Sequence, residues 1–133
     1  QYSTEQTPDR RATIGASFGG LIALFIAHRR PDLFGLVASQ SGFLSRSGDA
    51  IVERYRSMPR LPIHIHLIIG TYETHIGPFE RDSAEANFLR GNRAMRDVLQ
   101  THRYRHAYAE YHEGHSWGLW RARLGEALRW LLT

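Results

Sequence analysis

The sequence predicts an α/β fold in which a parallel sheet of about four strands is flanked by helices. Strand-like segments rich in β-branched residues alternate with helix-like segments, and this alternation is typical of a parallel sheet covered by helices. A glycine-rich turn joins the first strand-like segment to an apolar, helix-like one. No internal repeat or low-complexity segment is present, so residues 1–133 are predicted to form a single domain.

The first part of the chain contains a polar entry loop, a short strand and an apolar helix. Residues 11–16 form the predicted strand. Residues 19–30 are apolar on nearly every side, which predicts a deeply buried helix that ends before Pro31. The next expected elements are a buried strand (33–39), a Ser- and Gly-rich loop (40–48) and a short amphipathic helix (50–57).

The second part begins with the clearest strand, residues 63–69, which reads Ile-His-Ile-His-Leu-Ile-Ile and stops at Gly70. Ser116 is a suitable N-cap for the last helix. The other expected elements are a polar loop (71–81), an amphipathic helix (82–100), a strand near a sheet edge (105–112) and the final helix (117–131).

The composition is that of a globular domain, with 42% hydrophobic and 23% charged residues. No apolar run approaches the roughly 20 residues that span a bilayer, so no membrane partner is expected. No signal peptide stands at the start, which favours the cytoplasm, although the sequence does not begin with Met and its true start is open. The absence of Cys excludes disulfides, thiolate metal sites and a Cys nucleophile.

All 17 basic residues are Arg, and the formal net charge is +4. The arginines are scattered and no recognition motif accompanies them, so nucleic acid is not an expected partner. The charge favours anionic substrates, and binding to an acidic polymer is the alternative that charge alone allows.

The glycine-rich turn has the pattern Gly-x-Ser-x-Gly around Ser17. A serine at the tip of a sharp strand-to-helix turn holds its hydroxyl clear of the backbone. Such a turn is strained, and a Cβ at position 15 or 19 is expected to clash with the backbone, which explains Gly15 and Gly19. Gly20 is expected to let the helix lie close to the strand. The alternative is a glycine-rich turn that merely packs a helix on a strand.

Three polar groups follow three predicted strands, in the chain order Ser17, Glu73, His115. The carboxyl ends of parallel strands share one edge of a sheet, so these side chains are expected to meet. A serine needs a base to take its proton, imidazole titrates near neutrality, and a carboxylate fixes the imidazole tautomer. The acid could instead come from the same region of the chain, which also holds Glu80, Asp82 and Glu85.

Two histidines, His64 and His66, lie on one face of the predicted strand 63–69. A metal site could use this spacing, but no third ligand is evident in the sequence. We therefore expect buried or boundary histidines, and neither a metal nor an organic cofactor.

The motifs resemble the putative-esterase family of α/β-hydrolases, which includes enterochelin esterases, feruloyl esterases, S-formylglutathione hydrolases and mycolyltransferases. The resemblance covers nearly the whole chain, and the helix with Asn92-Arg93-Ala94-Met95 is most similar to the enterochelin-esterase branch. It is carried by Gly15-Ala16-Ser17-Phe18-Gly19-Gly20, Gly70-Thr71-Tyr72-Glu73 and Gly114-His115-Ser116-Trp117-Gly118-Leu119-Trp120-Arg121.

The resemblance implies a serine carboxylic-ester hydrolase that works through an acyl-serine intermediate on a small-molecule ester, a siderophore ester or another one. Ser17 would be the nucleophile, His115 the base and Glu73 the acid. The backbone N–H of Phe18 would bind the oxyanion. Tyr72 and Trp117 are expected to line the substrate pocket.

The chain departs from the family pattern because only residues 1–10 precede the first strand, where family members carry several strands and helices. The sequence therefore resembles the C-terminal half of an α/β-hydrolase, with the N-terminal strands absent. The strand 11–16 would then be an exposed apolar edge, which is an association hazard and allows a homo-oligomer, while the sequence leaves the oligomeric state open. The alternatives to a hydrolase are an acyltransferase of the same family and a non-catalytic truncated half-domain or interaction module.

Overall fold

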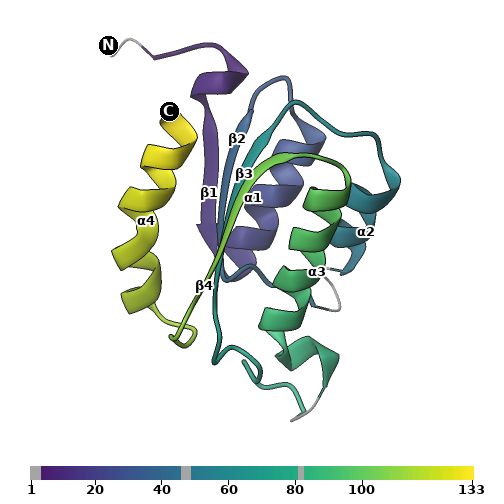
Figure 1. The fold of residues 1–133 in the computed structure, drawn as a ribbon, viewed down its shortest axis with the longest axis vertical. Coiled ribbons are helices and arrows are strands. Elements are labelled where there is room, and N and C mark those ends of the chain that lie inside the picture. The colour runs from purple at the N-terminus through teal and green to yellow at the C-terminus, as the bar shows by residue number, and fades with distance from the viewer. Residues whose placement is uncertain (1–3, 46–48, 81–82) are drawn as a thin grey trace.

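The computed structural model describes residues 4–45, 49–80 and 83–133, and it contains a four-stranded parallel sheet (Figure 1). The strand order follows the chain, β1-β2-β3-β4, so each strand pairs with its neighbour in sequence. The predicted α/β fold, a parallel sheet flanked by helices, is confirmed. The strands are β1 (Ala12–Ala16), β2 (Leu36–Gln40), β3 (His64–Gly70) and β4 (Arg105–Tyr111).

The helices cover the sheet in two layers (Figure 1). Helix α1 (Phe18–Arg29) and helix α3 (Phe88–Thr101) pack on one face, with α2 (Asp49–Ser57) against both of them. Helix α4 (Trp117–Leu132) packs alone on the other face. Two short 3-10 helices, η1 (Pro8–Arg10) and η3 (Ala84–Ala86), precede β1 and α3. Among the described residues, no helix is both long and apolar enough to cross a membrane.

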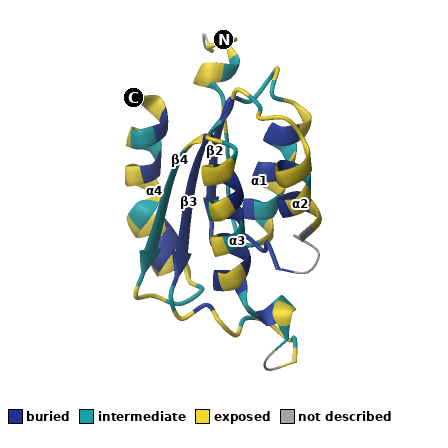
Figure 2. Cartoon of the chain, turned by 45° about the vertical axis from the view of Figure 1, so that its right-hand side comes forward, coloured by how far each residue is buried: buried dark blue, intermediate teal, exposed yellow. Residues whose placement is uncertain are grey.

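The core lies on both faces of the two central strands, which Figure 2 shows as buried along their length. Successive side chains of a strand point to opposite faces. Val37 of β2 accordingly packs with the α1–α3 layer, whereas Leu36 and Ala38 pack against Ala127 and Leu131 of α4. Each large apolar side chain buried in this way stabilises the fold by about 1.5–3 kcal/mol. The central strands therefore hold the site-bearing edge of the sheet rigid.

Strand β1 is an edge of this sheet and is open to solvent on its outer side. The helix that follows it was predicted to be deeply buried, and this prediction is wrong: Ile22 is 53% exposed and Phe25 is 48% exposed. Helix α1 buries Ala23, Leu24 and Ala27 against the sheet, and no described element covers its outer side. An apolar helix is thus half-exposed because the sheet and α2 together cover only part of its surface.

Two predicted elements are shorter than expected for identifiable reasons. The helix predicted from residue 82 begins at Phe88, because Asn87 caps it by accepting the N–H of Arg90, and Ser83 separately caps η3. The strand predicted over 33–39 begins at Leu36. The N–H groups of Leu33 and Phe34 both donate to the carbonyl of Arg30, so these residues extend the turn after α1.

Candidate active site

Ser17 occupies the turn between β1 and α1 with a φ of 57°, in the left-handed region that residues other than glycine seldom adopt. A Cβ on Gly15 would lie 2.2 Å from the carbonyl oxygen of Gly19, and a Cβ on Gly20 would lie 2.6 Å from Ser39 Oγ. The expectations for Gly15 and Gly20 are confirmed. The expectation for Gly19 is wrong: a Cβ there would meet no atom within 4 Å, because the position faces outward from the turn.

Backbone hydrogen bonds hold Ser17 in this strained conformation. Its N–H donates to the carbonyl of Gln40 at 2.9 Å, which extends the pairing of β1 with β2 by one residue. Its own carbonyl accepts the N–H groups of Gly20 at 3.0 Å and Phe43 at 3.1 Å. Strain of this kind persists where surrounding contacts over-determine the backbone, and here they fix the direction of the Cα–Cβ bond of Ser17.

The structure brings Ser17, His115 and Glu73 together at the carboxyl edge of the sheet. His115 Nε2 lies 2.9 Å from Ser17 Oγ, and His115 Nδ1 lies 2.6 Å from Glu73 Oε2. Ser17 follows β1, Glu73 lies in the turn after β3, and His115 lies in the loop between β4 and α4. Parallel pairing in register aligns the ends of these strands, which is why residues far apart in sequence meet.

The carboxylate of Glu73 is fully buried, with 0% of the residue exposed, and both its oxygens have partners. Oε1 accepts the backbone N–H of Gly70 at 2.9 Å and the hydroxyl of Ser41 at 2.6 Å, while Oε2 faces His115. A carboxylate in this position accepts the Nδ1–H of His115 and leaves Nε2 as an acceptor for the Ser17 hydroxyl. The geometry suits proton transfer from serine to imidazole.

The other acids considered from the sequence do not take this place. Glu80 is exposed in the loop after β3, and Glu85 belongs to η3, away from the turn that carries Glu73. Asp82 lies outside the described residues. The carboxylate at His115 is therefore that of Glu73.

Aromatic rings surround His115. Phe88 and Trp120 each meet its ring edge-to-face, with centroids 5.1 Å and 4.9 Å away. Such contacts hold an imidazole in one orientation and exclude water from part of its surface. Trp117 packs against Trp120 but is 71% exposed.

Two further aromatic side chains near the turn are open to solvent. Phe18, the first residue of α1, is 58% exposed and packs on Phe43. Tyr72 precedes Glu73 and is 66% exposed. Exposed aromatic rings beside a buried polar site provide flat apolar surface for a ligand.

The two histidines of β3 have apolar and charged neighbours, with Arg105 near His64 and Glu126 near His66. His66 is buried and its ring packs near Trp130, while His64 is half-buried. Burial lowers the pKa of both, so both tend to be neutral. In the described ranges, no group of three His, Cys, Asp or Glu side chains is placed to hold a metal ion.

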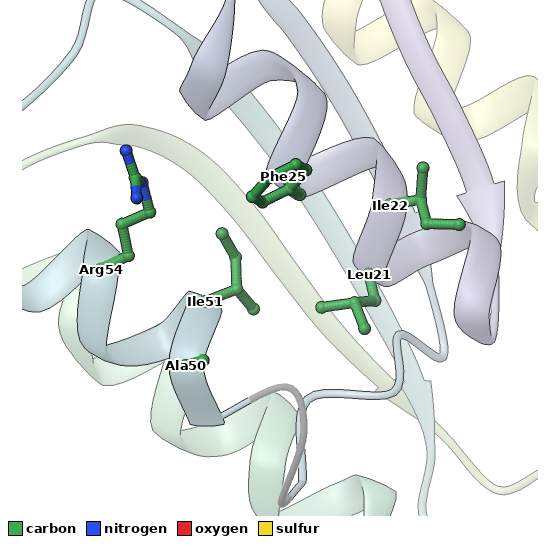
Figure 3. A pocket seen from close by; sticks show the side chains of 6 residues that line it. All are labelled: Leu21, Ile22, Phe25, Ala50, Ile51 and Arg54. Atoms are coloured by element: carbon green, nitrogen blue, oxygen red, sulfur yellow. The ribbon is translucent and has the colours of Figure 1, made fainter.

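An apolar pocket of ≈ 340 Å³ lies between α1 and α2, away from Ser17 (Figure 3). Figure 3 shows Leu21 and Ile51 facing each other across it, with Arg54 at one end. Arg54 is already engaged, because its Nε donates to His28 Nδ1 at 2.9 Å. The pocket thus belongs to the half-exposed outer side of α1. Neither Ser17 nor Glu73 nor His115 lines this pocket. Its lining residues are Leu21, Ile22, Phe25, Ala50, Ile51 and Arg54.

A parallel sheet with a strained serine turn, a histidine and an acid at its carboxyl edge defines a protein of the α/β-hydrolase-like class. The chain belongs to the esterase family: the family model described as "Putative esterase" matches residues 1–131. It is also similar to the uncharacterized protein YjcH of Bacillus subtilis (strain 168), with 26% identity over 132 residues. That alignment covers 99% of this chain and 53% of YjcH, so the chain spans about half the length of this curated relative.

Solved structures of esterases share the fold. The enterobactin esterase FES from Shigella flexneri, in the presence of enterobactin, matches with a TM-score of 0.78 and 26% identity. The match covers 96% of this chain and 31% of that one. A ferulic acid esterase matches with a TM-score of 0.76 and 18% identity, over 96% of this chain and 52% of that one, and this likeness concerns the fold alone.

Two groups near the site were not among the predicted site residues: Ser41, which contacts Glu73, and the indole N–H of Trp120, which contacts Ser41. A signal for Ser41 was present. It is a serine followed by glycine at the carboxyl end of a buried strand, the same kind of position that drew attention to Ser17. For the indole N–H no local signal exists, because a tryptophan in an amphipathic helix is usually core.

Proposed function

We propose that this chain carries the catalytic groups of a serine carboxylic-ester hydrolase. The observation that carries the proposal is the continuous hydrogen-bond chain from Ser17 through His115 to Glu73. Ser17 attacks the ester carbonyl and passes its proton to His115 Nε2. His115 then protonates the leaving alcohol, and an acyl-serine forms. Water, activated by the same imidazole, releases the acid and restores Ser17.

Glu73 and Phe18 support this chemistry in different ways. Buried Glu73 keeps the proton of neutral His115 on Nδ1 and stabilises the imidazolium that forms when Ser17 is deprotonated. Phe18 is the first residue of α1, where a backbone N–H has no earlier helical carbonyl to bond. That N–H, at the positive end of the helix, supplies one donor to the oxyanion.

The substrate class that fits best is an ester with an aromatic group. Phe18, Tyr72 and Trp117 offer exposed rings around the buried polar site. The similar enterobactin esterase from Shigella flexneri was solved in the presence of enterobactin and in the presence of 2,3-di-hydroxy-N-benzoyl-serine, which carries an aromatic benzoyl group. A siderophore-type ester, or another ester that carries an aromatic group, is therefore the proposed substrate. Transfer of the acyl group to an alcohol differs only in the nucleophile that enters.

The test is labelling of the purified chain by a fluorophosphonate, which reacts with activated serines, followed by mass spectrometry to locate the adduct. We expect stoichiometric labelling at Ser17, none in Ser17→Ala, and unchanged labelling in Ser57→Ala, which removes an exposed serine at the end of α2. A folded chain that does not react would contradict the proposal. It would favour the non-catalytic half-domain as the function of this chain.

A further inference from the structure

Ser41 follows β2 at the same edge of the sheet as Ser17 and Glu73, and it is completely buried. Its hydroxyl lies between two groups: Glu73 Oε1 at 2.6 Å and Nε1 of Trp120 at 2.8 Å. This hydroxyl therefore links the carboxylate beside His115 to helix α4 on the far side of the sheet.

The chemistry of the three groups fixes the direction of both hydrogen bonds. An indole N–H is a donor only, so Trp120 donates to the oxygen of Ser41. A carboxylate is an acceptor, so the single hydroxyl proton of Ser41 points at Glu73. Trp120 thus removes the rotational freedom that a serine hydroxyl normally has. The Ser41 proton is left with one acceptor, Glu73.

Serine is not the residue that the backbone at this position prefers. Ser41 has a φ of 49°, in the left-handed region where glycine carries no steric penalty. Its N–H donates to the carbonyl of Ile68 at 2.8 Å, which holds the strained conformation in place. Glycine stands at the next position, 42, but the strained position 41 carries a serine and thus a hydroxyl. Strain of this kind concentrates at functional positions.

Trp120 is itself held from two sides. The side-chain amide of Gln40 donates to its backbone carbonyl at 2.8 Å, and its ring meets the ring of His115 edge-to-face. Gln40, the last residue of β2, and Ser41, which follows it, therefore hold the same tryptophan, one through its carbonyl and one through its indole. The result is a closed set of contacts that joins β2, α4, Glu73 and His115.

We infer that Ser41 is a positioning residue for the proposed reaction. It holds the Glu73 carboxylate so that Oε2 faces His115 Nδ1, and Trp120 sets the direction of its proton. The inference rests on the proposed function of Ser17, His115 and Glu73. Ser41 does not contact the reacting hydroxyl of Ser17, because Glu73 and His115 lie between them in the hydrogen-bond chain. Its effect on the reaction therefore passes through Glu73.

Two substitutions remove the hydroxyl while treating the backbone differently. Ser41→Ala keeps the strain, whereas Ser41→Gly relieves it, so an effect shared by both comes from the hydroxyl. Ser39→Ala is the matched control: Ser39 lies two residues earlier, is equally buried, and its hydroxyl has no hydrogen-bond partner in the described part of the chain. A third variant, Trp120→Phe, keeps an aromatic ring and removes the indole N–H.

The first readout is nitrogen–proton correlation NMR of the full chain, which reports the ring nitrogen of neutral His115 that carries the proton. His115→Gln identifies the signals. We expect the proton on Nδ1 in the wild type and in Ser39→Ala, and a mixture of the two tautomers in both Ser41 variants. Trp120→Phe is expected to give a smaller shift in the same direction, because Ser41 keeps its hydroxyl but loses its fixed direction.

The second readout is the rate of fluorophosphonate labelling at Ser17 as a function of pH. Both Ser41 variants are expected to react about 10-fold to 100-fold more slowly, the loss typical of one hydrogen bond to a charged group. Their pH profile is expected to change shape, which a purely structural role would not cause. Ser39→Ala is expected to match the wild type in rate and profile.

The two readouts separate this inference from the proposed function. An unlabelled wild type would reject the proposed function, while the tautomer of His115 would still decide whether Ser41 positions Glu73. An unchanged His115 tautomer in both Ser41 variants would overturn the inference whatever the labelling shows. If Ser41→Ala does not fold, Ser41→Gly and Trp120→Phe give the same decision.

Discussion

Gly15 and Gly19 occupy equivalent places in the Gly-x-Ser-x-Gly pattern, but only one of them is confined. A Cβ on Gly15 would lie 2.2 Å from the carbonyl oxygen of Gly19, whereas a Cβ on Gly19 would meet nothing within 4 Å. The turn therefore requires a glycine at position 15 but leaves room for a side chain at position 19. This requirement is set by the closeness of the strand backbone to the first turn of α1.

We expect Gly15→Ala to disrupt the turn and abolish fluorophosphonate labelling of Ser17, because the methyl group would collide with backbone that has no room to move. The cost is at least the 1–3 kcal/mol typical of overpacking. Gly19→Ala is the control, and it should be neutral or stabilise α1 by up to about 1 kcal/mol. Urea unfolding gives the stability and labelling the activity. Normal labelling of Gly15→Ala would show that the turn is not confined.

The stability of the fold should fall as the pH drops below 6.5. His28 is buried on α1, and Nδ1 accepts a hydrogen bond from Arg54. Burial first, and then the charges of Arg54 and Arg29, lower the pKa of His28 from its ordinary 6.5. Below pH 6.5 the unfolded chain therefore binds a proton that the folded chain does not, so acid favours unfolding until the folded pKa is passed.

The measurement is the free energy of unfolding by urea between about pH 5 and pH 8, the range in which an ordinary histidine changes charge. His28→Gln should reduce the dependence on pH without removing it, because burial also lowers the pKa of His64 and His66. Ser57→Ala, which removes an exposed side chain that does not titrate in this range, should leave the dependence unchanged. Identical slopes for the wild type and His28→Gln would contradict this account.

Trp117 offers a test of aromatic recognition that leaves the fold intact. Its side chain is 71% exposed at the start of α4, so Trp117→Ala should change stability by less than about 1 kcal/mol. In an active preparation it should raise the KM for an aromatic ester such as ethyl ferulate several-fold more than for ethyl butanoate. Leu132→Ala, an exposed apolar residue at the other end of α4, is the control. Equal effects on both esters would remove Trp117 from the substrate surface.

The open edge of β1 and the outer side of α1 should make the isolated chain self-associate. Ile14, Ile22 and Phe25 are all at least 41% exposed, and β1 has one free row of backbone hydrogen-bonding groups. Sedimentation of the chain, 15.3 kDa as a monomer, should show larger species as concentration rises.

The paired substitution Ile22→Glu with Phe25→Ser should return it to a monomer, because a charge and a hydroxyl replace apolar surface. Met58→Ser, an equally exposed apolar position just after α2, should have little effect. A wild type that remains monomeric at all concentrations would argue against self-association through this surface.

The strands were predictable from local hydrophobic patterns. The position of Ser17, Glu73 and His115 at one edge of the sheet was predictable from these strands and one rule of parallel sheets. Each residue follows a strand, and the carboxyl ends of parallel strands coincide. The exposure of α1 was not predictable, since the sequence of an apolar helix is the same whether its outer side is covered or open to solvent. The start of α3 could not be predicted from the sequence, because Asn87 caps the helix in the middle of a segment whose pattern is helical throughout. The contact of Ser41 with Trp120 joins residues 79 apart, which no local pattern reveals.

The hydrogen bond between Ser17 and His115 has a consequence for folding. It joins residues 98 apart that follow the two outermost strands, β1 and β4. The strands in between must all be docked in register before these two ends align, and a slip of one residue in β3 would turn its core side chains to the opposite face. We therefore expect fluorophosphonate labelling of Ser17 to appear last during assembly. In a refolding experiment, its appearance would mark completion of the sheet, later than the gain of helical signal.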